Sequence, residues 1–262
     1  RTWPNQSGAI VRMASGGPLM LINTVVLFLR ELMPVMLLLS VLSVWQREHW
    51  RTLLLSIAVP ALIVLLMMAK QYSEISLWAD GAGLELVYAI LYFSVPLLLA
   101  LALILSKFRI CLVGFAGAAL LAINGSNLVL YFFVYQREAS ATPALLLGSA
   151  LGVGIGLSVA VLLYYSLDEL KRFRRQYFYW VVALIAARQS SEATQILIQS
   201  DWIPGGPVLW DSQKIINEQS EYGQFFNALV GYEATPTLSQ LIAYFLTAAV
   251  ILALSYRKGA IR

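Results

Sequence analysis

Long apolar stretches separated by short polar turns run along almost the whole chain. A helix needs about 20 apolar residues to cross the hydrocarbon core of a bilayer, and these stretches have about that length. The pattern therefore predicts an all-α, polytopic membrane protein with seven transmembrane helices. The predicted spans are residues 20–45, 52–69, 84–106, 110–135, 143–167, 177–200 and 237–256.

The composition agrees with lipid as the solvent. Of the 262 residues, 60% are hydrophobic and 12% are charged, whereas soluble domains are about one quarter charged. The single cysteine, Cys111, and the single histidine, His49, exclude a disulfide framework and a zinc site with Cys/His spacing. Because His49 lies in a charged turn, no catalytic set is expected, and we interpret the chain as a non-enzyme without a tightly bound cofactor. Cys111 lies in an apolar stretch, where a packing role is expected.

The charges of the turns predict the orientation in the membrane. Basic residues concentrate at 46–51, 107–109, 168–176 and 257–262, which alternate with the other turns along the chain. Because cytoplasmic loops carry an excess of lysine and arginine, we expect the N-terminus outside and the C-terminus in the cytoplasm. The net charge of +4 then belongs to these loops, and no nucleic-acid partner is expected. The expected location is the bacterial inner membrane.

Three regions follow from this arrangement. Residues 1–19 are polar, with several glycines and prolines, and are predicted to be poorly ordered. Residues 20–256 form the seven-helix domain, which includes an extracytoplasmic loop at 201–236, and residues 257–262 form a cytoplasmic tail. The outer turns are acidic, which concentrates cations by electrostatic focusing, although acidic outer loops are also what the positive-inside rule leaves behind. The outer acidic residues include Glu74, Asp80, Glu85, Asp201, Asp211, Glu218, Glu221 and Glu233.

Ionisable side chains at membrane depth are costly and mark functional sites. Arg30 and Glu31 lie near the middle of the first span. Adjacent residues point about 100° apart on a helix, so the two need not pair with each other. Pro34 cannot donate a backbone hydrogen bond to the carbonyl of Arg30. This leaves a carbonyl oxygen beside Glu31 that a cation can use.

The sixth span carries a polar stripe. Arg188, Glu192, Gln195 and Gln199 are spaced by four, three and four residues, which places them on one helix face. This face is predicted to line the bundle interior or a water-filled path. The alternative is an Arg188–Glu192 pair that neutralises itself and joins helices.

Two other spans carry polar or small residues. Asn124 and Asn127 share a face of the fourth span, where their amide oxygens suit either cation binding or hydrogen bonds between helices. The fifth span contains glycines that are predicted to allow close helix packing. These are Gly148, Gly152, Gly154 and Gly156.

Several short stretches also carry a family resemblance. They are Leu29–Pro34, Gly83–Leu86, Trp210–Ser212, Gly223–Tyr232 and Pro236–Tyr244. In these stretches the chain resembles the oxidase-dependent iron permease family of bacterial and fungal high-affinity iron transporters, over about residues 20–256. The resemblance implies a seven-span permease whose Arg-Glu-x-x-Glu motifs bind iron. It also implies an extracytoplasmic metal-binding or oxidase partner on the 201–236 side.

The chain departs from the family pattern at two places. Arg30 and Glu31 match the first motif, but Pro34 replaces its second glutamate, and the fourth span has Asn124 and Asn127 where a second motif is expected. Having fewer carboxylates favours a divalent ion such as Fe²⁺ or Mn²⁺. The resemblance aligns Glu85 with the acidic segment of the family, where it would guide the ion inward.

We therefore expect a metal-ion permease, with iron as the transported ion. One alternative is a non-transporting membrane subunit that retains the permease fold, and another is a transporter of protons or an organic solute. The expected metal-site residues are Glu31, Glu192, Glu85, Asn124, Asn127 and Gln195, supported by Arg30, Arg188 and Pro34.

Overall fold

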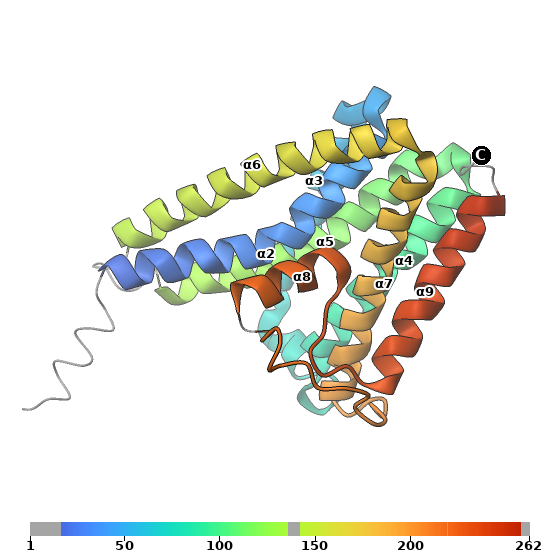
Figure 1. The fold of residues 1–262 in the computed structure, drawn as a ribbon. Helices are drawn as coiled ribbons and strands as arrows, with labels where there is room; N and C mark the ends of the chain where they lie inside the picture. The colour runs from blue at the N-terminus through green and yellow to red at the C-terminus, as the bar shows by residue number, and fades with distance from the viewer. Residues whose placement is uncertain (1–16, 136–141, 219, 258–262) are drawn as a thin grey trace, which may run out of the picture.

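The computed structural model describes residues 17–135, 142–218 and 220–257, which form a bundle of long helices (Figure 1). Residues 1–16 of the predicted N-terminal segment and residues 258–262 of the predicted tail lie outside the described residues. A shorter helix, α8 (Glu221–Val230), lies in the predicted 201–236 loop, and one-turn 3-10 helices occupy three turns. The long helices are α2 (Gly17–Trp45), α3 (Trp50–Ser76), α4 (Gly83–Ile104), α5 (Arg109–Tyr135), α6 (Thr142–Phe173), α7 (Arg175–Gln199) and α9 (Leu238–Arg257). The 3-10 helices are η1 (Arg47–His49), η2 (Ala79–Gly81) and η3 (Ser106–Phe108).

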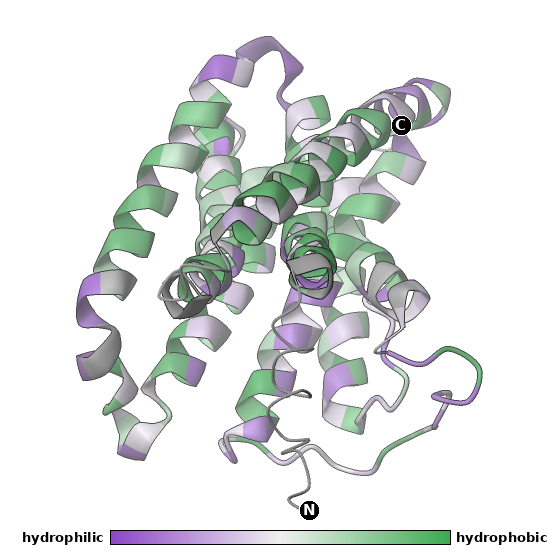
Figure 2. Cartoon of the chain, turned by 90° about the vertical axis from the view of Figure 1, so that its left-hand side faces the viewer, coloured by the Kyte–Doolittle hydropathy of each residue, from purple (hydrophilic) through white to green (hydrophobic). Residues whose placement is uncertain are grey.

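Within the described part of the chain, six helices are long and apolar enough to cross a membrane: α2 to α6 and α9. The prediction of an all-helical, polytopic membrane protein is therefore confirmed at this level. Hydrophobic residues run along most of these helices, and hydrophilic residues gather at the turns (Figure 2). Exposed apolar side chains on α3 and α6, such as Leu55 and Leu162, are what a helix in contact with lipid requires.

Helix α7, the predicted sixth span, is not among the six helices that are apolar enough to cross a membrane. Its polar stripe lowers its mean hydropathy. The helix packs against α4, α6, α8 and α9, and 11 of its 25 residues are buried. Neighbouring helices therefore shield its polar groups, so that the helix does not need an apolar surface of its own.

The basic turns meet at one end of the bundle, opposite the loop between α7 and α9 (Figure 1). Arg47 in η1 forms an ion pair of 3.2 Å with Asp168 in α6. Gln176 near the start of α7 donates a hydrogen bond of 2.9 Å to Tyr256 near the end of α9. These contacts bring turns that are distant in sequence to one face of the molecule.

The structure corrects several predicted boundaries. The prediction of a loop at 168–176 is wrong, because α6 continues to Phe173 and only Arg174 separates α6 from α7. An ion pair of 2.9 Å between Asp168 and Arg172, four residues apart, supports this last turn. Helix α2 begins at Gly17, inside the segment predicted to be poorly ordered. Cys111 is exposed on α5, so its predicted packing role is wrong.

Two glycines of α6 let this helix pack closely along α2. A Cβ atom at Gly148 would lie 2.7 Å from the Cβ of Thr24, and one at Gly152 would lie 2.5 Å from the Cβ of Phe28. At Gly154 the same atom would meet nothing within 4 Å. The packing prediction is confirmed for Gly148 and Gly152 and is wrong for Gly154, which lies on another face of the helix.

Candidate cation site

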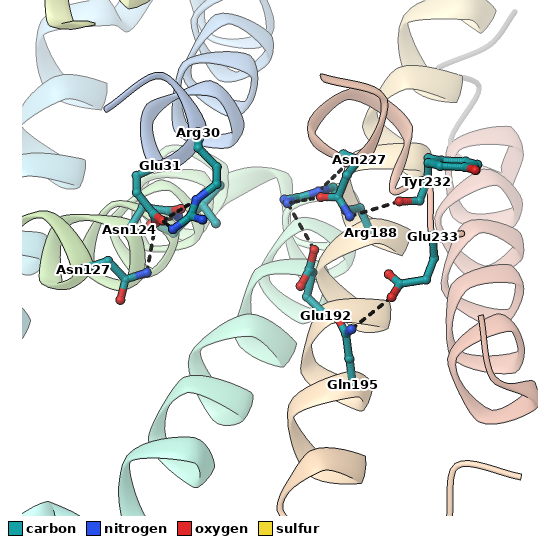
Figure 3. A network of polar contacts seen from close by, with 11 residues as sticks. Arg30, Glu31, Asn124, Asn127, Arg188, Glu192, Gln195, Asn227, Tyr232 and Glu233 are labelled. Carbon is teal, nitrogen blue, oxygen red and sulfur yellow. Dashed lines mark hydrogen bonds and ion pairs between the residues drawn. The ribbon is translucent and has the colours of Figure 1, made fainter. Parts of the chain in front are cut away.

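A cavity of about 270 Å³ lies between α2, α7 and α8. Three carboxylates and two arginines line it, together with amide side chains, and its volume has room for several water molecules. Figure 3 shows most of these side chains and their hydrogen bonds. The lining residues are Arg30, Pro34, Arg188, Glu192, Gln195, Glu218, Asn227, Ala228 and Glu233.

Arg188 joins α7 to α8 across this cavity (Figure 3). Its Nε atom donates to the backbone carbonyl of Asn227 at 2.7 Å, and its Nη2 atom donates to the Asn227 side-chain oxygen at 2.9 Å. The same Nη2 atom lies 3.2 Å from a carboxylate oxygen of Glu192. Because the Arg188 side chain is only 9% exposed, its charge needs these partners. The Arg188–Glu192 ion pair, which was the alternative interpretation of the polar stripe, is therefore present.

The loop after α8 adds a second carboxyl group. Gln195 of α7 donates a hydrogen bond of 3.0 Å to Glu233. Burial raises the pKa of Glu233 from its ordinary value of 4.5 to about 7, and the nearby charges of Glu218 and Glu192 act in the same direction. Arg188 opposes this shift of the pKa without cancelling it. Glu233 therefore changes its charge near neutral pH.

Local sequence signals place α8 and the loop that follows it. Ser220 caps the helix by accepting a hydrogen bond of 3.1 Å from the backbone of Gly223. Gly231 ends the helix with a φ of 73°, a left-handed conformation that favours glycine. A Cβ atom at Gly231 would lie 3.1 Å from the Cβ of Arg188. The turn therefore brings the chain against α7, and Glu233 follows two residues later.

Glu218 holds this loop from the other side. Its carboxylate accepts a hydrogen bond from the backbone N–H of Ala234. The hydroxyl of Tyr232 donates a hydrogen bond of 3.1 Å to the carbonyl of Ile216. The 201–220 segment and the 231–237 segment are thus bound to each other beside the cavity.

Glu31 belongs to an adjoining cluster at the junction of α2 and α5. One of its carboxylate oxygens lies 2.9 Å from Nη2 of Arg30, and the other accepts a hydrogen bond of 2.9 Å from Asn127. The neighbours Arg30 and Glu31 do pair, although adjacent positions diverge on a helix, because the long arginine side chain reaches back to the carboxylate. Asn124 is buried, and its side-chain nitrogen donates to the carbonyl of Leu120 at 2.8 Å.

Arg30 connects the two clusters. Its guanidinium group pairs with Glu31, and the residue also lines the cavity beside Pro34. The side chain of Arg30 is 54% exposed, whereas that of Glu31 is only 8% exposed. The buried carboxylate of Glu31 is therefore separated from the cavity by the half-exposed side chain of Arg30.

The structure brings together only part of the predicted metal site. Arg30, Pro34, Arg188, Glu192 and Gln195 line one cavity, whereas Glu31 and Asn127 form the adjoining cluster. Asn124 does not line that cavity, and Glu85 is exposed in the first turn of α4. Within the described ranges, no three His, Cys, Asp or Glu side chains are grouped so that they could hold a metal ion. An ion in the cavity would need water or amide oxygens to complete its shell.

The sequence alone did not predict the three other polar residues of the cavity, Glu218, Asn227 and Glu233. It assigned Glu218 and Glu233 to the outer surface and gave Asn227 no role. Ser220 and Gly231 were the available signals, since a serine cap and a terminal glycine predict a short helix in the loop. No sequence signal shows that this helix folds back against α7.

The described residues thus combine six helices that are long and apolar enough to cross a membrane with a charged cavity between α2, α7, α8 and the segments that flank α8. Comparisons of the chain with protein-family models, curated proteins and solved structures gave no match.

Proposed function

We propose that the chain is a permease that carries a metal cation across a membrane, with iron as the first candidate ion. The observation that carries this proposal is the cavity in which Glu192, Glu218 and Glu233 face a shared polar space. Glu192 lies on the proposed sixth span, where a carboxylate at membrane depth is costly and characterises an ion pathway. The resemblance of the loop and first-span motifs to iron permeases supports the choice of iron.

The charge balance of the cavity suits transient binding of a cation. With all groups ionised, three carboxylates face the two arginines Arg30 and Arg188, which leaves one negative charge. A cation that enters competes with the arginines for the carboxylates. Movement of Arg30 would expose Glu31 and Asn127 as the next oxygen ligands.

In this proposal α7 completes a set of seven spans, with the 201–237 segment outside and the basic turns in the cytoplasm. The membrane is the bacterial inner membrane. Exposed Glu85 and the outer acidic turns concentrate the ion before it enters. An extracytoplasmic metal-binding or oxidase partner delivers iron on the 201–236 side, as the family resemblance implies.

Uptake of radioactive iron into proteoliposomes tests the proposal, with Fe²⁺ and Fe³⁺ measured separately. We expect Glu192→Gln and Glu31→Gln each to lower uptake about tenfold or more, the effect of losing about 1.4 kcal/mol of ion stabilisation. Glu169→Gln is the matched control, because it removes the same charge at an exposed position near the end of α6, away from the cavity.

The control variant should transport iron at the wild-type rate. Uptake that survives both glutamate substitutions would retain the transporter but reject this site. Proton or solute flux that ignores iron would point to a different transporter.

A second candidate is a non-transporting membrane subunit that retains the permease fold. The observation that favours it is the closure of both intramembrane carboxylates by ion pairs, Glu31 with Arg30 and Glu192 with Arg188. This candidate predicts no iron flux from the wild-type protein, even when an extracytoplasmic partner is added.

A further inference from the structure

A second cavity, of about 560 Å³, lies at the end of the bundle where the basic turns meet. Its wall combines the end of α2, η1, the start of α5, the end of α6 and the start of α7. Its size exceeds that of the candidate cation site, and its charge is of the opposite sign. The lining residues are Val44, Trp45, Gln46, Arg47, Glu48, His49, Arg109, Asp168, Lys171, Arg172 and Arg175.

The wall carries an excess of positive charge. Five basic side chains face two carboxylates, Glu48 and Asp168, which leaves a net charge of +3 with His49 neutral. Asp168 already pairs with two of the arginines, Arg47 at 3.2 Å and Arg172 at 2.9 Å. Like charges that surround one cavity repel each other. An anion bound in the cavity would reduce this electrostatic repulsion.

Several of these cations are held in place by the fold. Lys171 donates a hydrogen bond of 2.6 Å to the carbonyl of Val44, and its ammonium lies 5.3 Å from the ring centre of Phe178. The guanidinium carbon of Arg109 lies 5.9 Å from the ring centre of Trp45. Lys171 and Arg109 are therefore positioned before any ligand arrives, which lowers the entropy cost of binding.

Dispersed basic turns are what the positive-inside rule alone requires. In this protein the basic turns are not dispersed, because segments distant in sequence converge so that their arginines and lysine line one cavity. Arginine presents a planar fork of donors that matches phosphate oxygens. Basic pockets between transmembrane helices bind phospholipid head groups.

We propose that this basic cavity binds a phosphate group, carried either by an anionic phospholipid at the membrane surface or by a soluble phosphate. The proposal does not depend on the permease function, because no residue of the cavity belongs to the candidate cation site. Arg109 and Arg175 supply charge from the starts of two different helices, and Lys171 supplies it from a third.

Two binding measurements on the purified full chain test the proposal. The first compares thermal unfolding in inorganic phosphate and in chloride at equal ionic strength. The second uses native mass spectrometry to compare retention of phosphatidylglycerol and of phosphatidylcholine. We expect the protein to prefer phosphate over chloride, phosphatidylglycerol over phosphatidylcholine, or both. The measurement that shows the preference identifies the source of the phosphate group.

A pair of double variants locates the site. Arg109→Gln with Arg175→Gln removes two charges from the cavity, and we expect affinity to fall at least about tenfold for each lost charge-assisted hydrogen bond. Lys107→Gln with Arg174→Gln removes the same charge from neighbouring positions that do not line the cavity. This control should bind within about twofold of the wild type.

If both double variants lose affinity for phosphate or anionic lipid equally, the binding site is a diffuse basic face and not the cavity. A wild-type protein that prefers neither phosphate over chloride nor anionic over zwitterionic lipid would overturn the proposal, whatever the variants do.

Discussion

Glu233 illustrates how one side chain acquires its properties from the fold around it. In the sequence it is one acidic residue among several in a loop. In the structure it is partly buried against α7, accepts a hydrogen bond from Gln195, and lies near Glu218 and Glu192. Its pKa of about 7 follows from that burial and those charges.

The raised pKa predicts a dependence of stability on pH. Unfolded Glu233 ionises near 4.5 and the folded residue near 7, so folding stability falls as the pH rises through that interval. We expect Glu233→Gln to unfold at a higher temperature than the wild type at pH 8, and the difference to vanish near pH 4. Thermal unfolding between pH 4 and pH 8 measures this difference in unfolding temperature.

Gln195→Ala retains the carboxyl group of Glu233 and should therefore preserve the pH dependence of the wild type. A difference between Glu233→Gln and the wild type that does not change with pH would contradict the assignment of the titration to Glu233.

Cation binding should follow the same titration in the opposite sense. Ionised Glu233 adds a negative charge to the cavity, so binding should strengthen as the pH rises through about 7. In Glu233→Gln this rise should disappear while the remaining carboxylates still bind. A rise of the same size in the variant would assign the titration to another group.

At the scale of elements, glycine positions decide how closely α2 and α6 approach. We expect Gly152→Ala to destabilise the protein by roughly 1–3 kcal/mol, the usual cost of overpacking, because its new Cβ would lie 2.5 Å from that of Phe28. Gly154→Ala is the matched control, two residues along the same helix, and its Cβ would meet open space.

The control should be neutral or slightly stabilising, because alanine favours a helix over glycine. Denaturant or thermal unfolding in a fixed detergent compares the two. Equal effects of the two substitutions would show that helix propensity, and not the α2–α6 contact, controls this region.

At the scale of the whole molecule, the two polar ends should lie on opposite sides of the membrane. In a Cys111→Ser background, the single variants Trp210→Cys and Arg172→Cys should react with a membrane-impermeant thiol reagent from opposite sides. Both positions are exposed in the structure. We expect position 210 to react in right-side-out vesicles and position 172 in inverted ones.

The reverse pattern of labelling would invert the proposed orientation while retaining the fold. Labelling of both positions from one side would show that α7 does not complete a seventh span.

The amino-acid sequence by itself determined the helical, membrane-embedded character of the chain. Spans of apolar residues and the charges between them depend on local composition, and the long helices lie close to the predicted positions. The polar stripe of α7 was also readable, because helical periodicity places Arg188 and Glu192 on one face.

Only the tertiary structure decided which polar groups meet. Periodicity cannot show that Asn227 and Glu233, which lie 39 and 45 residues beyond Arg188, fold back onto α7. Nor does it show that Arg30 turns to Glu31 while also lining that cavity, or that Arg109 and Arg175 converge on a second one. Local pattern specifies the helices because their backbone bonds are local, whereas the two cavities arise from packing between segments distant in the chain.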